Sequence, residues 1–194
     1  MASEISVRDY NRSYDSGGSN RNPLVRTGLR LPMEPIRVLG GRGTGPTALS
    51  SYDAALASVD LHDYNLVHVS SVVPAGTPVE AVGTAPDLGP AGNRLTVVEA
   101  RRTLAPGGGG RACAAIGWAL PRDGAGVVYE GSGTDPEATR EEVREGLRAA
   151  RGLRDDRDWT GGESGLELAT ARASPERYVS AVALAAFGRS EPVG

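Results

Sequence analysis

Two adjacent serines, Ser70 and Ser71, follow an apolar stretch that begins at Asn65. Pro74 and Gly76 come shortly afterwards and predict a sharp turn of the chain. A serine hydroxyl is a nucleophile, and here it stands next to a peptide carbonyl. If the Ser71 hydroxyl attacks the Ser70 carbonyl, the peptide breaks between the two residues, and elimination followed by hydrolysis, with loss of ammonia, leaves a pyruvoyl group. The chemistry that this pair allows is therefore self-cleavage with creation of a reactive ketone.

The chain contains no lysine, because all 21 basic residues are arginine. Enzymes that condense an amine with a carbonyl often use a lysine, either directly or to hold pyridoxal phosphate (PLP). Without lysine, the carbonyl for such chemistry has to come from the protein itself. The Ser70–Ser71 pair is a place where the protein can make one, as a pyruvoyl group from Ser71, and no lysine is present to hold PLP.

Composition excludes several classes of partner. The 194 residues carry a formal net charge of −3, which gives no basic footprint for nucleic acid or an anionic membrane. No segment approaches the roughly 18 apolar residues of a membrane span. The single cysteine, Cys113, cannot form an intramolecular disulfide, and the polar N-terminus does not look like a signal peptide. We expect a cytoplasmic protein that binds neither nucleic acid nor membrane.

The N-terminal part differs from the rest of the chain. Residues 1–34 have little apolar periodicity and contain a run of serine, glycine and asparagine, so they are predicted to form a flexible arm. Residues 35–194 are enough for one domain. Its core is expected to consist of alanine, valine and leucine, since aromatic residues make up only 5% of the chain.

Apolar patterning predicts the elements of this domain. Strands are expected at 36–39, 66–72, 95–104, 112–120, 126–130 and 166–172. A glycine-rich connection at 106–110 predicts a loose hairpin between two of them. The glycines at 40–45 are predicted to form a plain loop rather than a phosphate cradle, because the lysine and spacing of such cradles are missing.

Three helices are predicted from the 3.6-residue period. The first covers 48–59 after the cap Thr47, and the second covers 134–151 after a capping box that begins at Thr134. The third begins at Pro175 and runs through the alanines near 185. Helices packed on antiparallel sheets, with no alternation of strand and helix, indicate the α+β class.

The serine pair lies in a segment, 65–76, that resembles the pyruvoyl-dependent arginine decarboxylases. The similarity extends over about residues 46–187 and includes Ser-Tyr-Asp-Ala-Ala-Leu at 51–56 and Val-Tyr-Glu-Gly at 128–131. It implies a layered αββα-type sandwich with antiparallel sheets. It also implies a homo-oligomer, either a trimer of cleaved protomers or a multiple of that trimer, with active sites between subunits.

The resemblance further implies a carboxy-lyase that activates itself, with a pyruvoyl group generated from Ser71 as its cofactor and with neither PLP nor metal. A proenzyme would cleave between Ser70 and Ser71, and the pyruvoyl group derived from Ser71 would form an imine with L-arginine, an amino acid substrate. The imine would accept the electrons released with carbon dioxide and yield agmatine. Glu130 matches the family's proton donor, and an apolar pocket would raise the pKa of that carboxyl.

Three more residues receive roles from the same comparison. Asn65 matches a residue that helps in processing and orientation beside the cleavage site. Asp53 matches the carboxylate that receives the substrate guanidinium, and Leu56 one turn later would line the path of the substrate's methylene groups. His68 is expected to be mainly structural.

Three alternatives remain open at this point. The chain is compatible with an uncleaved, catalytically silent homologue that serves as a structural or regulatory subunit. It is also compatible with an N-terminal-nucleophile hydrolase, in which Ser71 keeps its amine. Finally, an altered pocket would suit another basic or modified amino acid.

Overall fold

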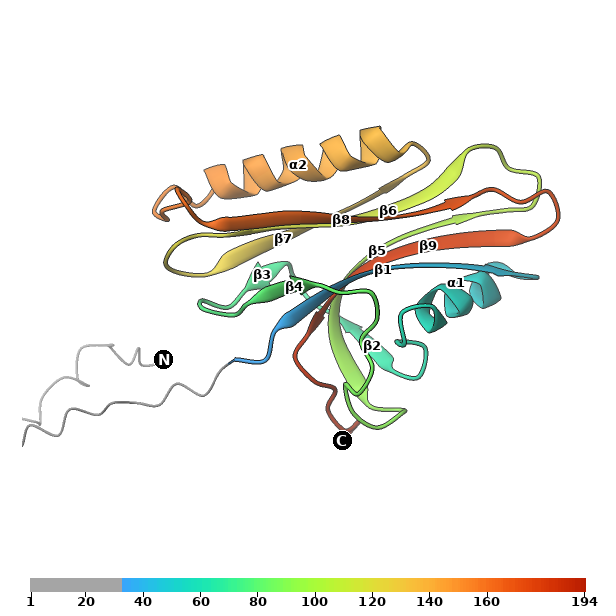
Figure 1. The fold of residues 1–194 in the computed structure, drawn as a ribbon, viewed down its shortest axis with the longest axis horizontal. Coiled ribbons are helices and arrows are strands. Elements are labelled where there is room, and N and C mark those ends of the chain that lie inside the picture. The colour runs from blue at the N-terminus through green and yellow to red at the C-terminus, as the bar shows by residue number, and fades with distance from the viewer. Residues whose placement is uncertain (1–32) are drawn as a thin grey trace, which may run out of the picture. The chain divides into compact units, whose positions relative to one another are not determined.

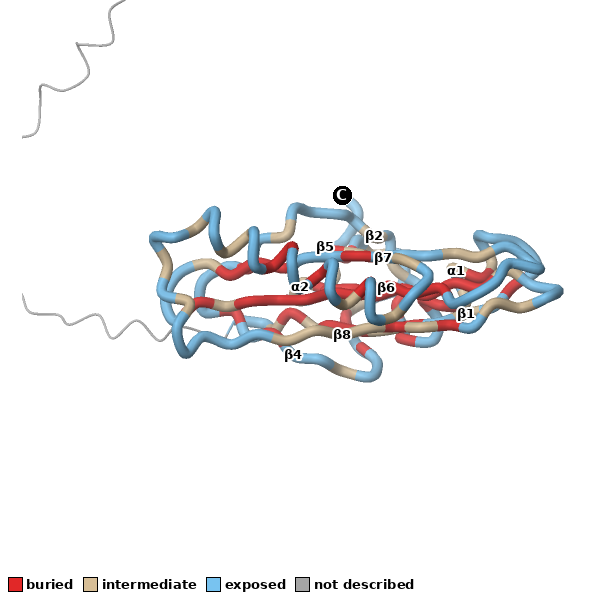
Figure 2. The backbone as a smooth tube through the Cα atoms, turned by 90° about the horizontal axis from the view of Figure 1, so that it is seen from above, coloured by how far each residue is buried: buried red, intermediate tan, exposed pale blue. Residues whose placement is uncertain are grey.

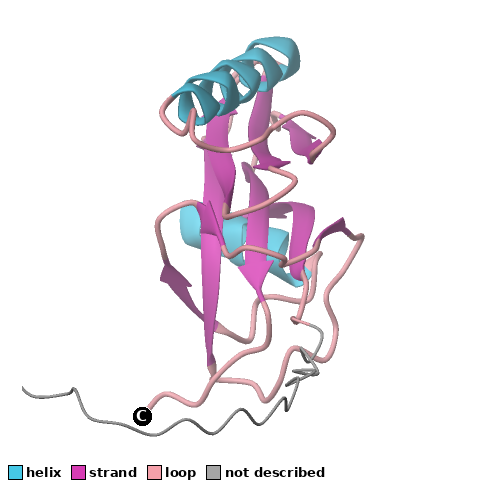
Figure 3. Cartoon of the chain, turned by 90° about the vertical axis from the view of Figure 1, so that its left-hand side faces the viewer, coloured by secondary structure: helices cyan, strands magenta, loops and turns pink. Residues whose placement is uncertain are grey.

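Two β-sheets lie face to face, and one helix covers the outer face of each (Figure 1). This arrangement comes from a computed structural model that describes residues 33–194, so the predicted arm at 1–34 falls almost entirely outside it. Within residues 33–194, more of the chain is in strands than in helices (Figure 3). The four layers confirm the α+β class and the αββα-type sandwich.

The first sheet has the strand order β2-β5-β9-β1-β4. Its central strand β9 pairs antiparallel with β5 and with β1, while the edge strands β2 and β4 pair parallel with their neighbours. Helix α1 follows β1 and packs on this sheet, and its capping box is formed by Thr47 and Ser50. The bounds are β1 Ile36–Gly45, α1 Ala48–Ala57, β2 Asn65–His68, β4 Val79–Ala81, β5 Arg94–Leu104 and β9 Tyr178–Phe187.

The second sheet is antiparallel throughout and has the order β3-β7-β6-β8. Helix α2 lies across it and begins after Asp135, whose side chain accepts a hydrogen bond from the backbone N–H of Ala138. The cap is thus Asp135 rather than the predicted Thr134. The bounds are β3 Val72–Val73, β6 Arg111–Leu120, β7 Gly126–Gly133, α2 Pro136–Gly152 and β8 Glu163–Arg172.

Three apolar clusters hold these layers together. The largest fills the space between the sheets and includes Val98, Ile116 and Ala183. The second joins α1 to the first sheet, and the third joins α2 to the second sheet. Buried residues accordingly follow the central strands, while the outer sides of the helices and the loops are exposed (Figure 2). Burial of this apolar surface is the main stabilising term.

The glycine-rich stretch after Ile36 is a strand, not the predicted loop. Strand β1 continues to Gly45, and Gly41, Gly43 and Gly45, at every second position, face α1. A Cβ atom on Gly41 would lie 2.4 Å from the Ala55 carbonyl oxygen, and one on Gly43 would lie 2.3 Å from the Ala55 nitrogen. The glycines therefore permit close packing of α1 on β1. In the sequence alone, glycines used in this way look the same as glycines that form a turn.

The predicted C-terminal helix is also wrong, because 178–187 forms strand β9. This strand is covered on one side by the second sheet and on the other by α1, so nearly every residue in it is buried. A strand buried on both faces reads as a continuous apolar run without a period of two. The alanines that suggested a helix have small side chains, which allow the second sheet and α1 to pack closely against β9.

Two predicted connections differ as well. The loop at 106–110 does not close a hairpin, since β5 belongs to the first sheet and β6 to the second. The predicted strand 66–72 is divided into β2 in the first sheet and β3 in the second. The residues between β2 and β3 therefore link the two sheets. Of the two helices in residues 33–194, neither has the length and apolar character needed to cross a bilayer.

Candidate active site

The Ser70–Ser71 peptide bond lies in the link between the sheets. On one side, β2 ends at His68, and the backbone N–H of Val69 still donates to the Val97 carbonyl of β5 at 3.1 Å. On the other side, Val72 begins β3 and pairs with Val127 of β7. A break in this link leaves each new chain end attached to its own sheet.

The hydroxyl of Ser71 is held by a carboxylate. Its Oγ donates a hydrogen bond to Oε2 of Glu130 at 3.0 Å, and the Ser71 carbonyl accepts one from the backbone N–H of Val128 at 2.9 Å. Both partners belong to β7, and Val128 on the same face packs between the sheets. Strand β7 thus fixes the predicted nucleophile beside a group able to take its proton.

The carbonyl that would be attacked has a donor of its own. The Ser70 carbonyl oxygen accepts a hydrogen bond from the backbone N–H of Val72 at 2.8 Å. This bond closes a three-residue γ-turn around Ser71, which does not have a positive φ. When a hydroxyl adds to the Ser70 carbonyl, negative charge develops on this oxygen, and the Val72 N–H is placed to stabilise it.

In the single protomer this site is open. Glu130 is exposed, which differs from the apolar pocket expected around it, and the Ser71 side is only partly covered. Three large apolar residues of the same stretch, Val67, Val69 and Val72, are exposed too. Apolar side chains on both sides of a reactive bond are typical of a surface that another chain covers.

The predicted substrate-binding residues line a hollow of about 630 Å³ on the α1 side of the first sheet. Asp53 and Leu56 enter it from α1, and Asn65 and His68 enter it from β2. Asp53 is exposed and takes part in no ion pair within residues 33–194. The hollow therefore presents an available carboxylate near the apolar side chain of Leu56, as recognition of a guanidinium on an alkyl chain requires.

Within one chain, Asn65 does not lie beside the predicted cleavage site. Its side-chain amide donates to the Gly92 carbonyl oxygen at 2.6 Å and so fixes the start of β2. Five residues of extended chain, about 16 Å, separate it from Ser70. Its predicted part in processing stays a prediction, while its place in the same hollow as Asp53 is a feature of the structure.

Sequence reasoning missed a polar network in the wall of this hollow. Oε2 of Glu99 accepts a hydrogen bond from the Tyr52 hydroxyl at 3.1 Å, and Nε2 of His68 lies 2.7 Å from the same oxygen. Burial and the neighbouring Glu99 carboxylate raise the pKa of Tyr52 to about 12. One signal of this network was present in the sequence: Glu99 interrupts the apolar residues of β5. A charged residue at such a position has to be paired if it is buried.

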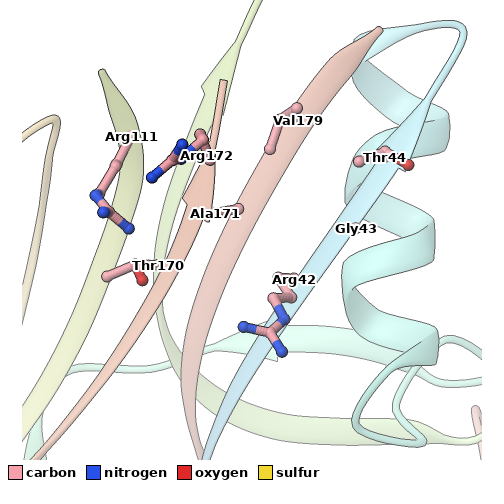
Figure 4. A pocket seen from close by; sticks show the side chains of 8 residues that line it. All are labelled: Arg42, Gly43, Thr44, Arg111, Thr170, Ala171, Arg172 and Val179. Carbon is pink, nitrogen blue, oxygen red and sulfur yellow. The ribbon is translucent and has the colours of Figure 1, made fainter. Parts of the chain in front are cut away.

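A second hollow, of about 480 Å³, lies where β1, β6 and β8 come together (Figure 4). Arg42, Arg111 and Arg172 line it, and none of the predicted site residues does. Arg111 and Arg172 are directly opposite each other in the register of β6 and β8. Because three guanidinium groups repel a fourth, this hollow does not suit an arginine side chain. Of these two hollows, the one that contains Asp53 has the charge that an arginine substrate requires.

Ser71 and its contacts fit the requirements of a pyruvoyl precursor. The nucleophile, the base and the hydrogen-bond donor to the carbonyl all belong to the described residues. These residues therefore fit a cofactor that is made from the chain itself.

Comparison with known proteins agrees with this geometry. Residues 35–192 match the family of pyruvoyl-dependent arginine decarboxylases. The chain is 48% identical over 163 residues to pyruvoyl-dependent arginine decarboxylases from two strains of Halobacterium salinarum. These alignments cover 83% of this chain and 98% of each relative. The chain therefore belongs to the pyruvoyl-dependent arginine decarboxylase family, and it is a carboxy-lyase whose cofactor is a pyruvoyl group.

Proposed function

We propose that this protein cleaves itself between Ser70 and Ser71 and then converts L-arginine to agmatine and carbon dioxide. The observation that carries the proposal is the hydrogen bond from Ser71 Oγ to Glu130, together with the Val72 N–H on the Ser70 carbonyl. An uncleaved, silent homologue has no need for a nucleophile, a base and an oxyanion donor around one peptide bond.

Processing would begin with loss of the Ser71 hydroxyl proton to Glu130. The oxygen attacks the Ser70 carbonyl carbon, the peptide C–N bond breaks, and the nitrogen takes a proton, which leaves an ester and a free Ser71 amine. Elimination of the ester releases Ser70 as a C-terminal carboxylate and leaves a dehydroalanine at 71. After a shift of its double bond, water replaces the nitrogen, ammonia leaves, and residue 71 becomes a pyruvoyl group.

Catalysis would then use the groups that remain around residue 71. The pyruvoyl group supplies an electron sink for the bond that breaks as carbon dioxide leaves. Glu130, returned to its protonated form, would donate a proton to the former α-carbon. Asp53 would bind the guanidinium with two parallel hydrogen bonds, and Leu56 would contact the methylene chain. Two parallel hydrogen bonds between a carboxylate and a planar guanidinium favour arginine over lysine.

The active site is proposed to form between copies of the chain in a trimer. Within one protomer the Asp53 hollow lies on the α1 side of the first sheet, whereas Glu130 lies on the face of β7 that looks toward the space between the sheets. A second copy placed over Val67, Val69 and Val72 would bury these side chains and bring its own Asp53 hollow to the pyruvoyl group. Closed threefold symmetry would repeat that contact at every site.

The proposal includes the chain's organisation. Residues 35–194 would act as the single catalytic domain, cut into two fragments that remain associated, and 1–34 would be a flexible arm. A cytoplasmic location is supported by Cys113, which is a free, buried thiol in β6.

The test of the proposed function is decarboxylation by the purified full chain. Arginine, lysine and ornithine are supplied separately, and carbon dioxide and the amine product are measured. We expect agmatine from arginine, and no product when Ser71→Ala replaces the wild-type chain. Turnover of lysine but not arginine would refute the substrate assignment, and activity in Ser71→Ala would refute the pyruvoyl mechanism.

A further inference from the structure

A buried carboxylate connects α1 to the strand that leads to the cleavage site. The Glu99 side chain is only 5% exposed and belongs to β5, the neighbour of β2. Its Oε2 atom accepts a hydrogen bond from the Tyr52 hydroxyl at 3.1 Å and lies 2.7 Å from Nε2 of His68. A carboxylate only accepts hydrogen bonds, so the imidazole nitrogen is the donor.

This arrangement is costly for the fold. The second oxygen of Glu99, Oε1, is buried and has no hydrogen-bond partner within residues 33–194. A buried charge with one unpartnered oxygen destabilises a protein, and a well-packed apolar residue would avoid that cost. The Arg101 guanidinium stacks over the Tyr52 ring, 4.4 Å from its centroid, and forms no ion pair with Glu99. A role other than packing therefore accounts better for a glutamate here.

The position of His68 indicates what that role is. His68 is the last residue of β2 and stands two residues before the scissile carbonyl of Ser70. The backbone contact of Val69 with Val97 is the last one that ties this chain to the first sheet before the cleavage site. On the far side, Ser71 is already fixed to the second sheet through Val128 and Glu130.

The link is thus held at both ends, and Glu99 contributes the side-chain anchor on the upstream end. A shift of His68 along or away from β5 would rotate the Ser70 carbonyl relative to a Ser71 hydroxyl that cannot follow. In-line attack depends on the mutual orientation of the reacting atoms, and small misplacements slow such reactions strongly.

We propose that Glu99 is a positioning residue for self-cleavage, which acts by clamping His68 at the end of β2 so that the Ser70 carbonyl faces the Ser71 hydroxyl. Tyr52 holds the carboxylate from the opposite side. This inference rests on the proposed cleavage between Ser70 and Ser71 and adds a residue on another strand to it.

The experiment follows cleavage of the full chain after cell-free synthesis is stopped, with samples separated on a denaturing gel over time. Glu99→Ala and His68→Ala are each expected to slow cleavage by about tenfold or more, the effect of losing a hydrogen bond to a charged group. His68→Gln keeps an N–H donor for Glu99 and is expected to remain within about threefold of wild type. Tyr52→Phe leaves the His68 contact in place and should have the smaller effect.

A double-variant comparison separates positioning from general destabilisation. If Glu99 acts through His68, the double variant Glu99→Ala/His68→Ala will be no slower than the slower single variant. The matched control is Glu191→Ala, which removes an exposed carboxylate that also pairs with β5, at Arg94, and should leave cleavage unchanged. Thermal unfolding of each variant checks the fold; should Glu99→Ala unfold, the His68 variants carry the test, because that side chain is 59% exposed.

The outcomes are distinct. Cleavage of Glu99→Ala at the wild-type rate would overturn the positioning role, as would single-variant effects that multiply in the double variant. A wild-type chain that is never cleaved would overturn the proposed function itself, and this inference with it.

Discussion

The Ser71 hydroxyl donates a hydrogen bond to the Glu130 carboxylate at 3.0 Å in the intact chain. The residue expected to protonate the product during turnover therefore already touches the nucleophile of processing. One carboxylate on β7 is placed for two proton transfers in sequence, first as a base toward Ser71 and then as an acid toward the substrate carbon.

Glu130→Gln tests this double use. The sequence comparison alone predicts that the change spares cleavage and slows turnover, whereas the contact with Ser71 predicts that both become slow. We expect each to fall by about 100-fold, the lower range for loss of a positioned acid or base. Cleavage is followed on gels, and turnover is measured on the fraction that has cleaved. Glu141→Gln, on the outer side of α2, is the control. Cleavage of Glu130→Gln at the wild-type rate would show that Glu130 acts in turnover but not in self-cleavage.

Asp53→Ala tests recognition of the guanidinium. Loss of a charge-assisted bidentate pair is expected to weaken arginine binding by about 1.5–3 kcal/mol. The KM for arginine should rise accordingly, with little change in the rate of self-cleavage, because Ser71 does not line the hollow that contains Asp53. Asp156→Ala, at an exposed carboxylate, should leave the KM unchanged. An unchanged KM in Asp53→Ala would place the guanidinium elsewhere.

Gly43→Ala tests the packing of α1 on β1. The added methyl carbon would lie 2.3 Å from the backbone nitrogen of Ala55, so the helix has to move away from the strand. Overpacking of this kind is expected to lower the free energy of unfolding by about 1–3 kcal/mol. Gly109→Ala is the matched control, since a Cβ there meets no atom within 4 Å. Denaturant unfolding measures both, and equal stabilities would show that the close approach is not tight.

The raised pKa of Tyr52 predicts that the stability of the fold depends on pH in the alkaline range. Its pKa is raised from 10.0 to about 12 in the folded chain, so the folded state holds the phenol proton more tightly than the unfolded state does. This contribution to stability is complete below about pH 10 and is lost as the pH rises toward 12. Tyr52→Phe should therefore lose less stability than wild type between about pH 9 and pH 12. An identical loss in both proteins would contradict the assignment.

The sequence predicted the local chemistry better than the connections between elements. Ser70, Ser71 and Glu130 were named from motifs, and Ser71 and Glu130 meet in the structure because β3 pairs with β7. Helices α1 and α2 were predictable because each has one exposed face. Strand β9 was not, because burial on both faces removes the period of two that identifies a strand.

The network of Glu99, His68 and Tyr52 could not be predicted for a related reason. These residues come from three elements, and their contact depends on the parallel pairing of β2 with β5 and on where α1 packs. Pairing of strands distant in the chain leaves no mark on a single sequence. The prediction of a loop at the glycines of β1 was wrong for a different reason. Glycine is used both in tight turns and where two elements pack closely, so the residue type alone does not distinguish them.

The central claim is self-cleavage at residue 70 with conversion of Ser71 to a pyruvoyl group, and intact mass spectrometry of the denatured protein tests it most directly. We predict two chains, 1–70 and 71–194, with the second lighter by one ammonia than a fragment that begins with serine. Ser71→Ala should give one uncleaved chain. A wild-type protein of a single intact mass, or a 71–194 fragment that keeps its amine, would contradict the claim.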